Sequence, residues 1–155
     1  LEKFLYWAQQ LIAESLGKKT DGFFPTISNV PKDHHSLLQL YLEGPKDKLF
    51  VIFSSEEEST KKLRVNKLLN KRSLLNNKNL NQIKLAQKKA LIETFKKKKI
   101  SFREFKIKKI NEETLGQLFS YFILETILIG KLKNINPFDQ PAVEQVKKIT
   151  RRILT

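Results

Sequence analysis

Cysteine and methionine are both absent from this chain of 155 residues. Without cysteine the chain forms neither a disulfide nor a thiolate site, which agrees with a cytoplasmic protein. No apolar run approaches the roughly 20 residues of a membrane-spanning helix. Residues 1–12 lack a basic start and a small-residue cleavage site, so no signal peptide is predicted. Because the chain begins on Leu1 and contains no methionine, we expect it to be a piece of a longer product.

Several patterns typical of binding sites are missing as well. The sequence contains no glycine-rich phosphate loop and no internal repeat. Its two histidines, His34 and His35, are neighbours that would point apart on a helix, and no third ligand lies nearby. A zinc site is therefore not expected. The acidic run at residues 56–58 has no histidine or aspartate partner, and we assign it to solvent.

Charge of one sign is in large excess, with a formal net charge of +14. The excess is concentrated between Lys61 and Lys109, in a segment that is also rich in asparagine, isoleucine and leucine. Strongly basic proteins often bind nucleic acid or anionic membranes. Neither a zinc-finger pattern nor an aromatic RNA-binding strand accompanies the lysines here. We favour a solvated basic surface that attracts phosphorylated substrates, and nucleic-acid binding is the minority interpretation.

Hydrophobic periodicity predicts an α/β domain with a mainly parallel sheet, because strands alternate with helices of ten or more residues. Gly17 and Gly44 are placed to end the first two helices. A short extended piece is predicted at 22–26, whereas 63–79 shows no clear period. The helices are expected at 1–16, 33–43, 80–99, 111–130 and 141–153, and the strands at 49–53 and 100–107.

The stretch from Asn136 to Lys147 combines a turn with a helix start. Asp139 or Gln140 is a possible helix cap, and Pro141 is tolerated in the first helical turn. Gln140, Glu144 and Lys147 fall on another face of the helix than its apolar stripe. Periodicity alone favours an ordinary capped surface helix, with a positioned lysine as the alternative. The stripe that we predict to be buried consists of Val143, Val146, Ile149 and Ile153.

A second candidate for chemistry is Glu14, in the last turn of the first predicted helix. Gln10 is four residues earlier and so shares its helix face. A carboxylate at a helix end is suited to accept a proton from carbon. The alternative is a surface glutamate with no such role.

Three motifs resemble those of the glucose-6-phosphate isomerase family. Residues 138–147, F-D-Q-P-A-V-E-Q-V-K, match the family's C-terminal signature, with Ala142 where glycine is usual. Residues 14–18, E-S-L-G-K, resemble the segment that carries the base, and the glutamine at position 10 matches too. Residues 33–39, D-H-H-S-L-L-Q, resemble D-x-H-S-x-x-Q, which makes His35 the family's catalytic histidine. Leu38 departs from a glycine that is common there.

The resemblance implies that residues 1–155 form the second sugar-isomerase domain, a flavodoxin-like three-layer α/β/α sandwich. It implies that Glu14 moves a proton between C2 and C1 of a sugar phosphate, and that His35 and Lys147 open the sugar ring. Gln10 and Gln140 would line the pocket. Such domains gather their sites at strand ends and helix termini, where these segments could converge.

The resemblance also implies a homodimer in which the histidine comes from the other subunit, with no metal or organic cofactor. It covers only about the last third of a family member. The first sugar-isomerase domain, with its phosphate pocket and an arginine that stabilises the enediolate, has no counterpart here, so we expect the chain alone to be nearly inactive. The alternative is a non-catalytic module that senses sugar phosphates, against which the retained Glu14, His35 and Lys147 argue.

Overall fold

The computed structural model describes residues 1–18, 22–56 and 74–155. The chain divides into two compact units. Unit 1 comprises Leu1–Ile27 and Asn111–Thr155, and unit 2 comprises Ser28–Ile110. The predictions for the loop after residue 56 and for most of the segment 63–79 lie outside the described residues.

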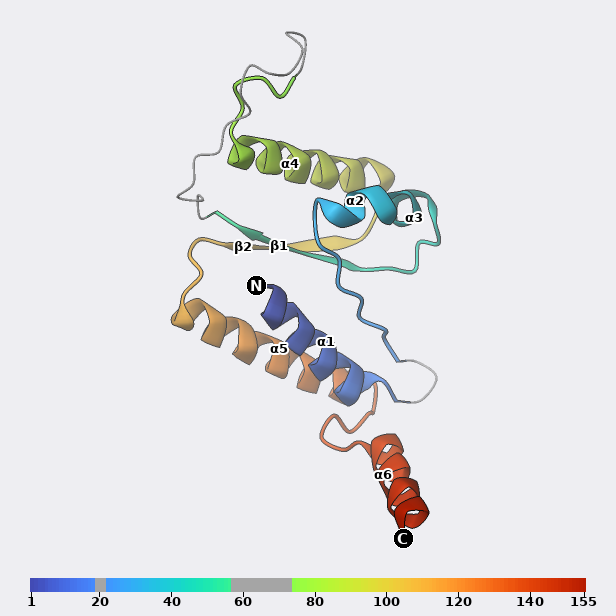
Figure 1. The fold of residues 1–155 in the computed structure, drawn as a ribbon. Helices are drawn as coiled ribbons and strands as arrows, with labels where there is room; N and C mark the ends of the chain where they lie inside the picture. The colour runs from blue at the N-terminus through green and yellow to red at the C-terminus, as the bar shows by residue number, and fades with distance from the viewer. Residues whose placement is uncertain (19–21, 57–73) are drawn as a thin grey trace. The chain divides into compact units, whose positions relative to one another are not determined.

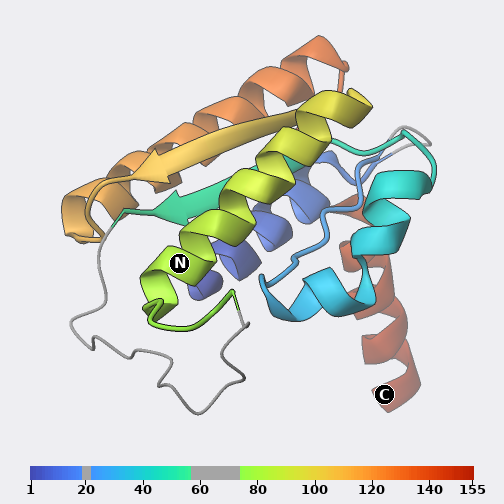
Figure 2. The same cartoon turned by 90° about the horizontal axis from the view of Figure 1, so that it is seen from above.

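Unit 2 contains a parallel pair of strands, β1 (Phe50–Ser55) and β2 (Phe102–Ile107). Their register runs from Phe50 opposite Phe102 to Ser55 opposite Ile107. Two parallel strands need a crossover connection, and α4 (Leu80–Lys98) lies within that connection. Figure 2 shows α4 crossing the two strands. The predicted α/β class with a parallel sheet is confirmed.

The start and end of α4 follow from local chemistry. The Asn79 side chain accepts a hydrogen bond from the backbone N–H of Gln82 at 2.8 Å, and the Gln82 side chain accepts one from the N–H of Asn79 at 2.9 Å. This reciprocal capping box satisfies two donors that the helix leaves unpaired. At the other end, three lysines occupy the last turn, where cations are favoured by the helix dipole. The helix ends at Lys99, whose φ of 55° is left-handed.

An aromatic cluster joins α4 to the strands. Phe50 and Phe102 are register partners on the two neighbouring strands, so their side chains lie on the same face of the sheet. Phe95 of α4, only 1% exposed, packs against both, with ring centroids 4.8 Å and 5.9 Å away. This cluster is the core of unit 2.

Two short helices, α2 (Lys32–Ser36) and α3 (Leu38–Glu43), replace the single helix predicted at 33–43. The helix is interrupted at Leu37. Asp33 lies inside α2, and its carboxylate accepts a hydrogen bond from the N–H of Asn29 at 2.6 Å. The predicted end at Gly44 is confirmed.

Unit 1 is built on α1 (Glu2–Leu16) and α5 (Glu112–Leu132), which pack together. The Phe4 ring lies 5.4 Å from that of Phe119 and 5.5 Å from that of Phe122, both edge-on. Trp7 lies 4.4 Å from Phe119. Phe119 and Phe122 of α5 therefore pack against α1 in the core of unit 1, whereas Tyr121 is 44% exposed. Residues 22–26, predicted as a short extended piece, are not part of a strand, and the Pro25 carbonyl accepts a hydrogen bond from Gln9 at 2.7 Å.

By length and composition α5 could cross a membrane, contrary to our expectation that no apolar run comes near that length; it is the one such helix among the described residues. A single helix of this kind is weak evidence for a membrane span, because core helices of soluble proteins share both properties. In this chain α5 carries Leu118, Phe122 and Thr126 as buried residues. We interpret it as a core helix of unit 1.

The last helix, α6 (Pro141–Leu154), has no buried residue. It follows beyond the C-terminal end of α5 (Figure 1). The prediction that its apolar stripe is buried is therefore wrong. Periodicity identifies an apolar face but does not say which surface covers it. The stripe residues are exposed by 44% at Val143, 64% at Val146, 40% at Ile149 and 74% at Ile153.

Candidate functional site

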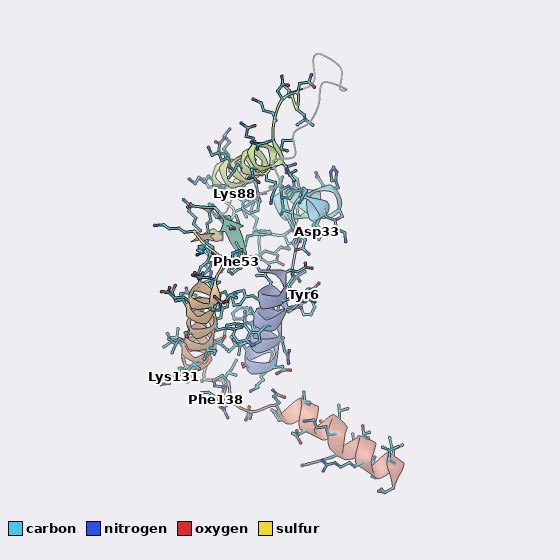
Figure 3. All side chains as sticks on the ribbon, turned by 60° about the vertical axis from the view of Figure 1, so that its left-hand side comes forward. Tyr6, Asp33, Phe53, Lys88, Lys131 and Phe138 are labelled. Carbon is cyan, nitrogen blue, oxygen red and sulfur yellow. The ribbon has the colours of Figure 1, made fainter. Side chains whose placement is uncertain are left out.

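A close turn after α5 begins the site. The N–H of Ile135 donates to the carbonyl of Gly130 at 2.8 Å. A Cβ atom on Gly130 would lie 3.1 Å from the Ile135 oxygen and 3.3 Å from Pro137. The missing side chain therefore lets the turn approach the helix closely. Ile135 is 6% exposed, which fixes this turn in the core of unit 1. The chain then continues through the exposed residue Phe138 into α6 (Figure 3).

Glu14, near the C-terminal end of α1, receives a hydrogen bond on each carboxylate oxygen. Its Oε1 accepts from Nε2 of Gln10 at 3.0 Å, one helical turn earlier. Its Oε2 accepts from Nε2 of Gln140 at 3.0 Å, although 126 residues separate the two. Three of the residues predicted to form the site are thus in direct contact.

This arrangement suits proton transfer. Two amide groups orient the carboxylate without neutralising it, and all three side chains are exposed. Each such bond is worth about 0.5–1.5 kcal/mol, so the pair fixes geometry more than it adds stability. An oriented, accessible carboxylate can act as a general base on a substrate placed beside it.

Lys18 ties the turn before α6 to the end of α1. Its Nζ donates to Oδ1 of Asp139 at 2.6 Å and to the carbonyl oxygen of Asn136. The hydrogen bond from Lys18, followed by the charge of that lysine, lowers the pKa of Asp139 below its usual value despite partial desolvation. Asp139 does not cap α6, because Gln140 is the N-cap residue and no side-chain cap forms.

The sequence alone predicts no role for Lys18, although Lys18 lies in the E-S-L-G-K segment and Asp139 in the F-D-Q segment. No pattern within either segment indicates that the two pair. Their contact depends on the turn at Gly130, which brings residues 121 positions apart together.

Lys147, the predicted ring-opening lysine, lies on α6 in an ion pair with Glu144. Its Nζ is 2.7 Å from Oε1 of Glu144, three residues earlier, and both side chains are more than half exposed. Lys147 is therefore held by Glu144, a residue of the same helix. The ion pair does not join it to the Glu14 cluster, and its role stays a prediction.

His35, the predicted catalytic histidine, is an exposed residue of α2 in unit 2. Its neighbour His34 is partly buried, and burial is the main cause of a lowered pKa at His34, with the charge of His35 adding to the effect and Asp33 opposing it. The other four predicted site residues belong to unit 1. The convergence of His35 with them stays a prediction.

No protein-family model matches the chain. Many curated proteins do, and three of them serve as examples. A protein of Methanococcus maripaludis named "Probable glucose-6-phosphate isomerase" is 36% identical over 162 residues, which include 100% of this chain and 35% of that protein. The glucose-6-phosphate isomerases of Methanocaldococcus jannaschii and Campylobacter jejuni are 34% and 35% identical, over 99% and 97% of this chain and 38% of each enzyme.

A solved structure agrees with the fold. The crystal structure of a hypothetical protein from Thermus thermophilus matches with a TM-score of 0.78 and 30% identity, over 97% of this chain and 38% of that one. The chain thus spans only a little over a third of the length of these relatives. The resemblance seen in the motifs is confirmed: over its whole length this chain is related to the glucose-6-phosphate isomerases.

Proposed function

We propose that this chain is the C-terminal part of a cytoplasmic glucose-6-phosphate isomerase, which interconverts glucose 6-phosphate and fructose 6-phosphate through a cis-enediol. The observation that carries the proposal is the hydrogen bond from Gln140 to Glu14. It joins two motif segments that lie at opposite ends of the sequence. A chance match in two short segments would give no reason for them to meet in space.

In this proposal Glu14 is the base that moves a proton between C2 and C1. A carboxylate can carry out both halves of the transfer, because it takes the proton from one carbon and returns it to the next. Gln10 and Gln140 hold its two oxygens, so that the carboxylate need not reorient during the transfer. Both amides also line the place where the sugar would bind.

His35 and Lys147 open the sugar ring in the same proposal, by proton transfer at the ring oxygen and the neighbouring hydroxyl. The exposure of both side chains is consistent with a site completed by further protein. We propose that His35 acts in the site of a second subunit, within a homodimer. No metal or organic cofactor has a part in this chemistry.

The chain alone is expected to turn over little substrate. It spans about a third of its relatives, and the proposed phosphate pocket and enediolate-stabilising arginine belong to the remainder. The loss of one preorganised group of that kind lowers a rate by about 10²–10³. Loss of the phosphate pocket would weaken substrate binding as well.

A chimaera tests the proposal. The segment of the Methanococcus maripaludis protein that corresponds to this chain is replaced by residues 1–155, and isomerase activity is measured in a coupled assay. The chimaera should be active, and Glu14→Gln should lower kcat by about 10²–10⁴ because it removes the base. The matched control is Glu113→Gln, which should leave kcat unchanged. Glu113 is exposed, and among the described hydrogen bonds it accepts one from Gln117 of the same helix.

Two results would contradict the proposal. One is a folded chimaera in which Glu14→Gln retains full activity. The other is turnover by the isolated chain near that of complete relatives. A folded chimaera that binds fructose 6-phosphate without turnover would favour the alternative, a non-catalytic module that binds sugar phosphates.

A further inference from the structure

We propose that Lys18 is a positioning residue: it fastens the turn at residues 136–139 to the end of α1 and thereby sets the hydrogen bond from Gln140 to Glu14. The catalytic importance of this role rests on the proposed function. The geometric claim does not, because it concerns contacts within unit 1 alone.

The contacts of Lys18 attach the turn at residues 136–139 to the end of α1. Its side chain is 16% exposed, much less than the 55% of Asp139. One ammonium group serves two acceptors of the same turn, the Asn136 carbonyl and the Asp139 carboxylate. A charge-assisted hydrogen bond from a lysine ammonium is stronger than one between neutral groups. Gln140 follows Asp139 directly, so this attachment acts one residue from the amide it would position.

The rest of the segment supplies little other restraint. The Gly130 contacts hold the turn as far as Pro137, but Phe138 is 77% exposed. On the other side of Gln140, α6 has no buried residue, so helix packing does not fix its first turn. The Asn136 side chain accepts the N–H of Phe138 at 3.1 Å, which shapes the turn locally without attaching it to α1. Among the described residues, Lys18 is what connects this turn to the end of α1 that carries Glu14.

A role for Lys18 in binding substrate phosphate is less consistent with these contacts. An ammonium has three donors, and two of them point at acceptors of the chain itself. Release of Lys18 toward a ligand would leave Asp139 without its counter-ion. The geometry therefore favours a structural hold on the site over direct contact with the sugar.

Side-chain amide resonances of the isolated chain test the claim by ¹⁵N NMR. Removal of the Glu14 carboxylate by Glu14→Gln should shift the side-chain amide signals of both Gln10 and Gln140, because both amides donate to it. In a Lys18→Met background the same Glu14→Gln change should still shift the Gln10 signal but no longer that of Gln140, because Gln10 reaches Glu14 within α1. Asp139→Asn should weaken the response of Gln140 in the same selective way.

The controls separate positioning from loss of fold. Lys147→Met removes a lysine whose ion pair with Glu144 lies within α6, so both glutamine responses should persist. The surviving Gln10 response in Lys18→Met shows that α1 is intact. If Lys18→Met unfolds unit 1, Asp139→Asn decides alone. The proposal is overturned if the response of Gln140 to the change at Glu14 is undiminished in a folded Lys18→Met or Asp139→Asn variant.

A kinetic measurement in the chimaera adds a second readout. Lys18→Met should lower kcat by about 10- to 100-fold with little change in KM, because a displaced amide misaligns the base more than it weakens binding. Lys18→Arg, which keeps the charge, should restore part of the rate. A rise in KM at constant kcat would instead mark Lys18 as a substrate-binding residue and would contradict the proposal. An inactive chimaera would count against the proposed function, while the NMR result would still decide the role of Lys18.

Discussion

Glu104 is a carboxylate on β2 with only 14% of its side chain exposed, and other strand and helix residues hold it. Ser54 of β1 donates to its Oε1 at 3.0 Å, and Lys88 of α4, labelled in Figure 3, donates to the same oxygen at 3.1 Å. Burial alone would raise the pKa of Glu104. The hydrogen bonds from Lys88 and Ser54, with the charges of Lys88 and Lys106, outweigh it and bring the pKa below the usual value of 4.5.

A carboxylate whose pKa is lower in the folded state than in the unfolded state stabilises the folded state at pH values above the unfolded pKa. This stabilisation is lost as the pH falls through the folded pKa. Glu104→Gln should therefore lower the free energy of unfolding by about 1–3 kcal/mol at pH 7, because Lys88 loses its charged partner. Urea unfolding at pH 7 and below pH 4 measures the effect. The difference from the unmodified chain should shrink at the lower pH.

The control for this prediction is Glu43→Gln at the exposed ion pair of Glu43 with Lys98. The hydrogen bond from Lys98, followed by its charge, lowers the pKa of Glu43 too, but water screens an exposed pair. Its removal should change stability much less. Equal effects of the two substitutions, or an effect of Glu104→Gln that does not depend on pH, would show that the buried network adds no pH-dependent stability.

At the scale of elements, α5 shows that two residues adjacent in sequence can contribute very differently to stability. Phe122 is 3% exposed and packs on Phe4, whereas the next residue back, Tyr121, is 44% exposed. Successive residues on a helix point about 100° apart, so one faces the core and the other faces away. The same logic separates the buried face of α5 from its outer apolar residues.

Phe122→Ala should destabilise unit 1 by about 3–5 kcal/mol, because it removes a buried ring and leaves a cavity. Tyr121→Ala should cost less than about 1 kcal/mol, since Tyr121 is 44% exposed and so loses much less buried area than Phe122. Circular dichroism during thermal unfolding compares the two variants. Equal losses would mean that the outer face of α5 is covered in solution by a surface of another molecule.

At the scale of the whole molecule, the predicted homodimer can be tested without a structure of the assembly. Chimaeras with Glu14→Gln and with His35→Asn are each expected to be inactive. If the histidine acts across the subunit interface, a mixed dimer contains one site with both substitutions and one with neither. Random mixing should then restore about a quarter of the activity, since half of the dimers are mixed.

Subunit exchange after mild denaturation, followed by the coupled assay, measures this recovery. His34→Asn is the matched control, because that residue is the neighbour to which the family motif assigns no role. No recovery after exchange, with mixed dimers demonstrated by mass spectrometry, would show that His35 acts in its own subunit or not at all.

Much of the fold was predictable because it depends on short-range chemistry. The capping residue Asn79 and the lysines at 96–98 lie where α4 begins and ends. The apolar run from residue 49 forms β1, and the alternation around Phe105 forms β2. The exposure of the α6 stripe was not predictable in this way, because it depends on whether another surface covers the apolar face. The interruption at Leu37 has no structural explanation among the described contacts.

The sequence by itself determined most of the elements, the parallel α/β class and the motif residues of the site, because periodicity, capping and motif spacing are local properties. Only the tertiary structure decided that Gln140 reaches Glu14, that Asp139 pairs with Lys18 instead of capping α6, and that Lys147 pairs within its own helix. The first two contacts depend on how closely the turn after α5 approaches Gly130 and on which groups then lie within hydrogen-bonding distance. Such distances are set by packing between segments more than 100 residues apart, and no local pattern encodes them.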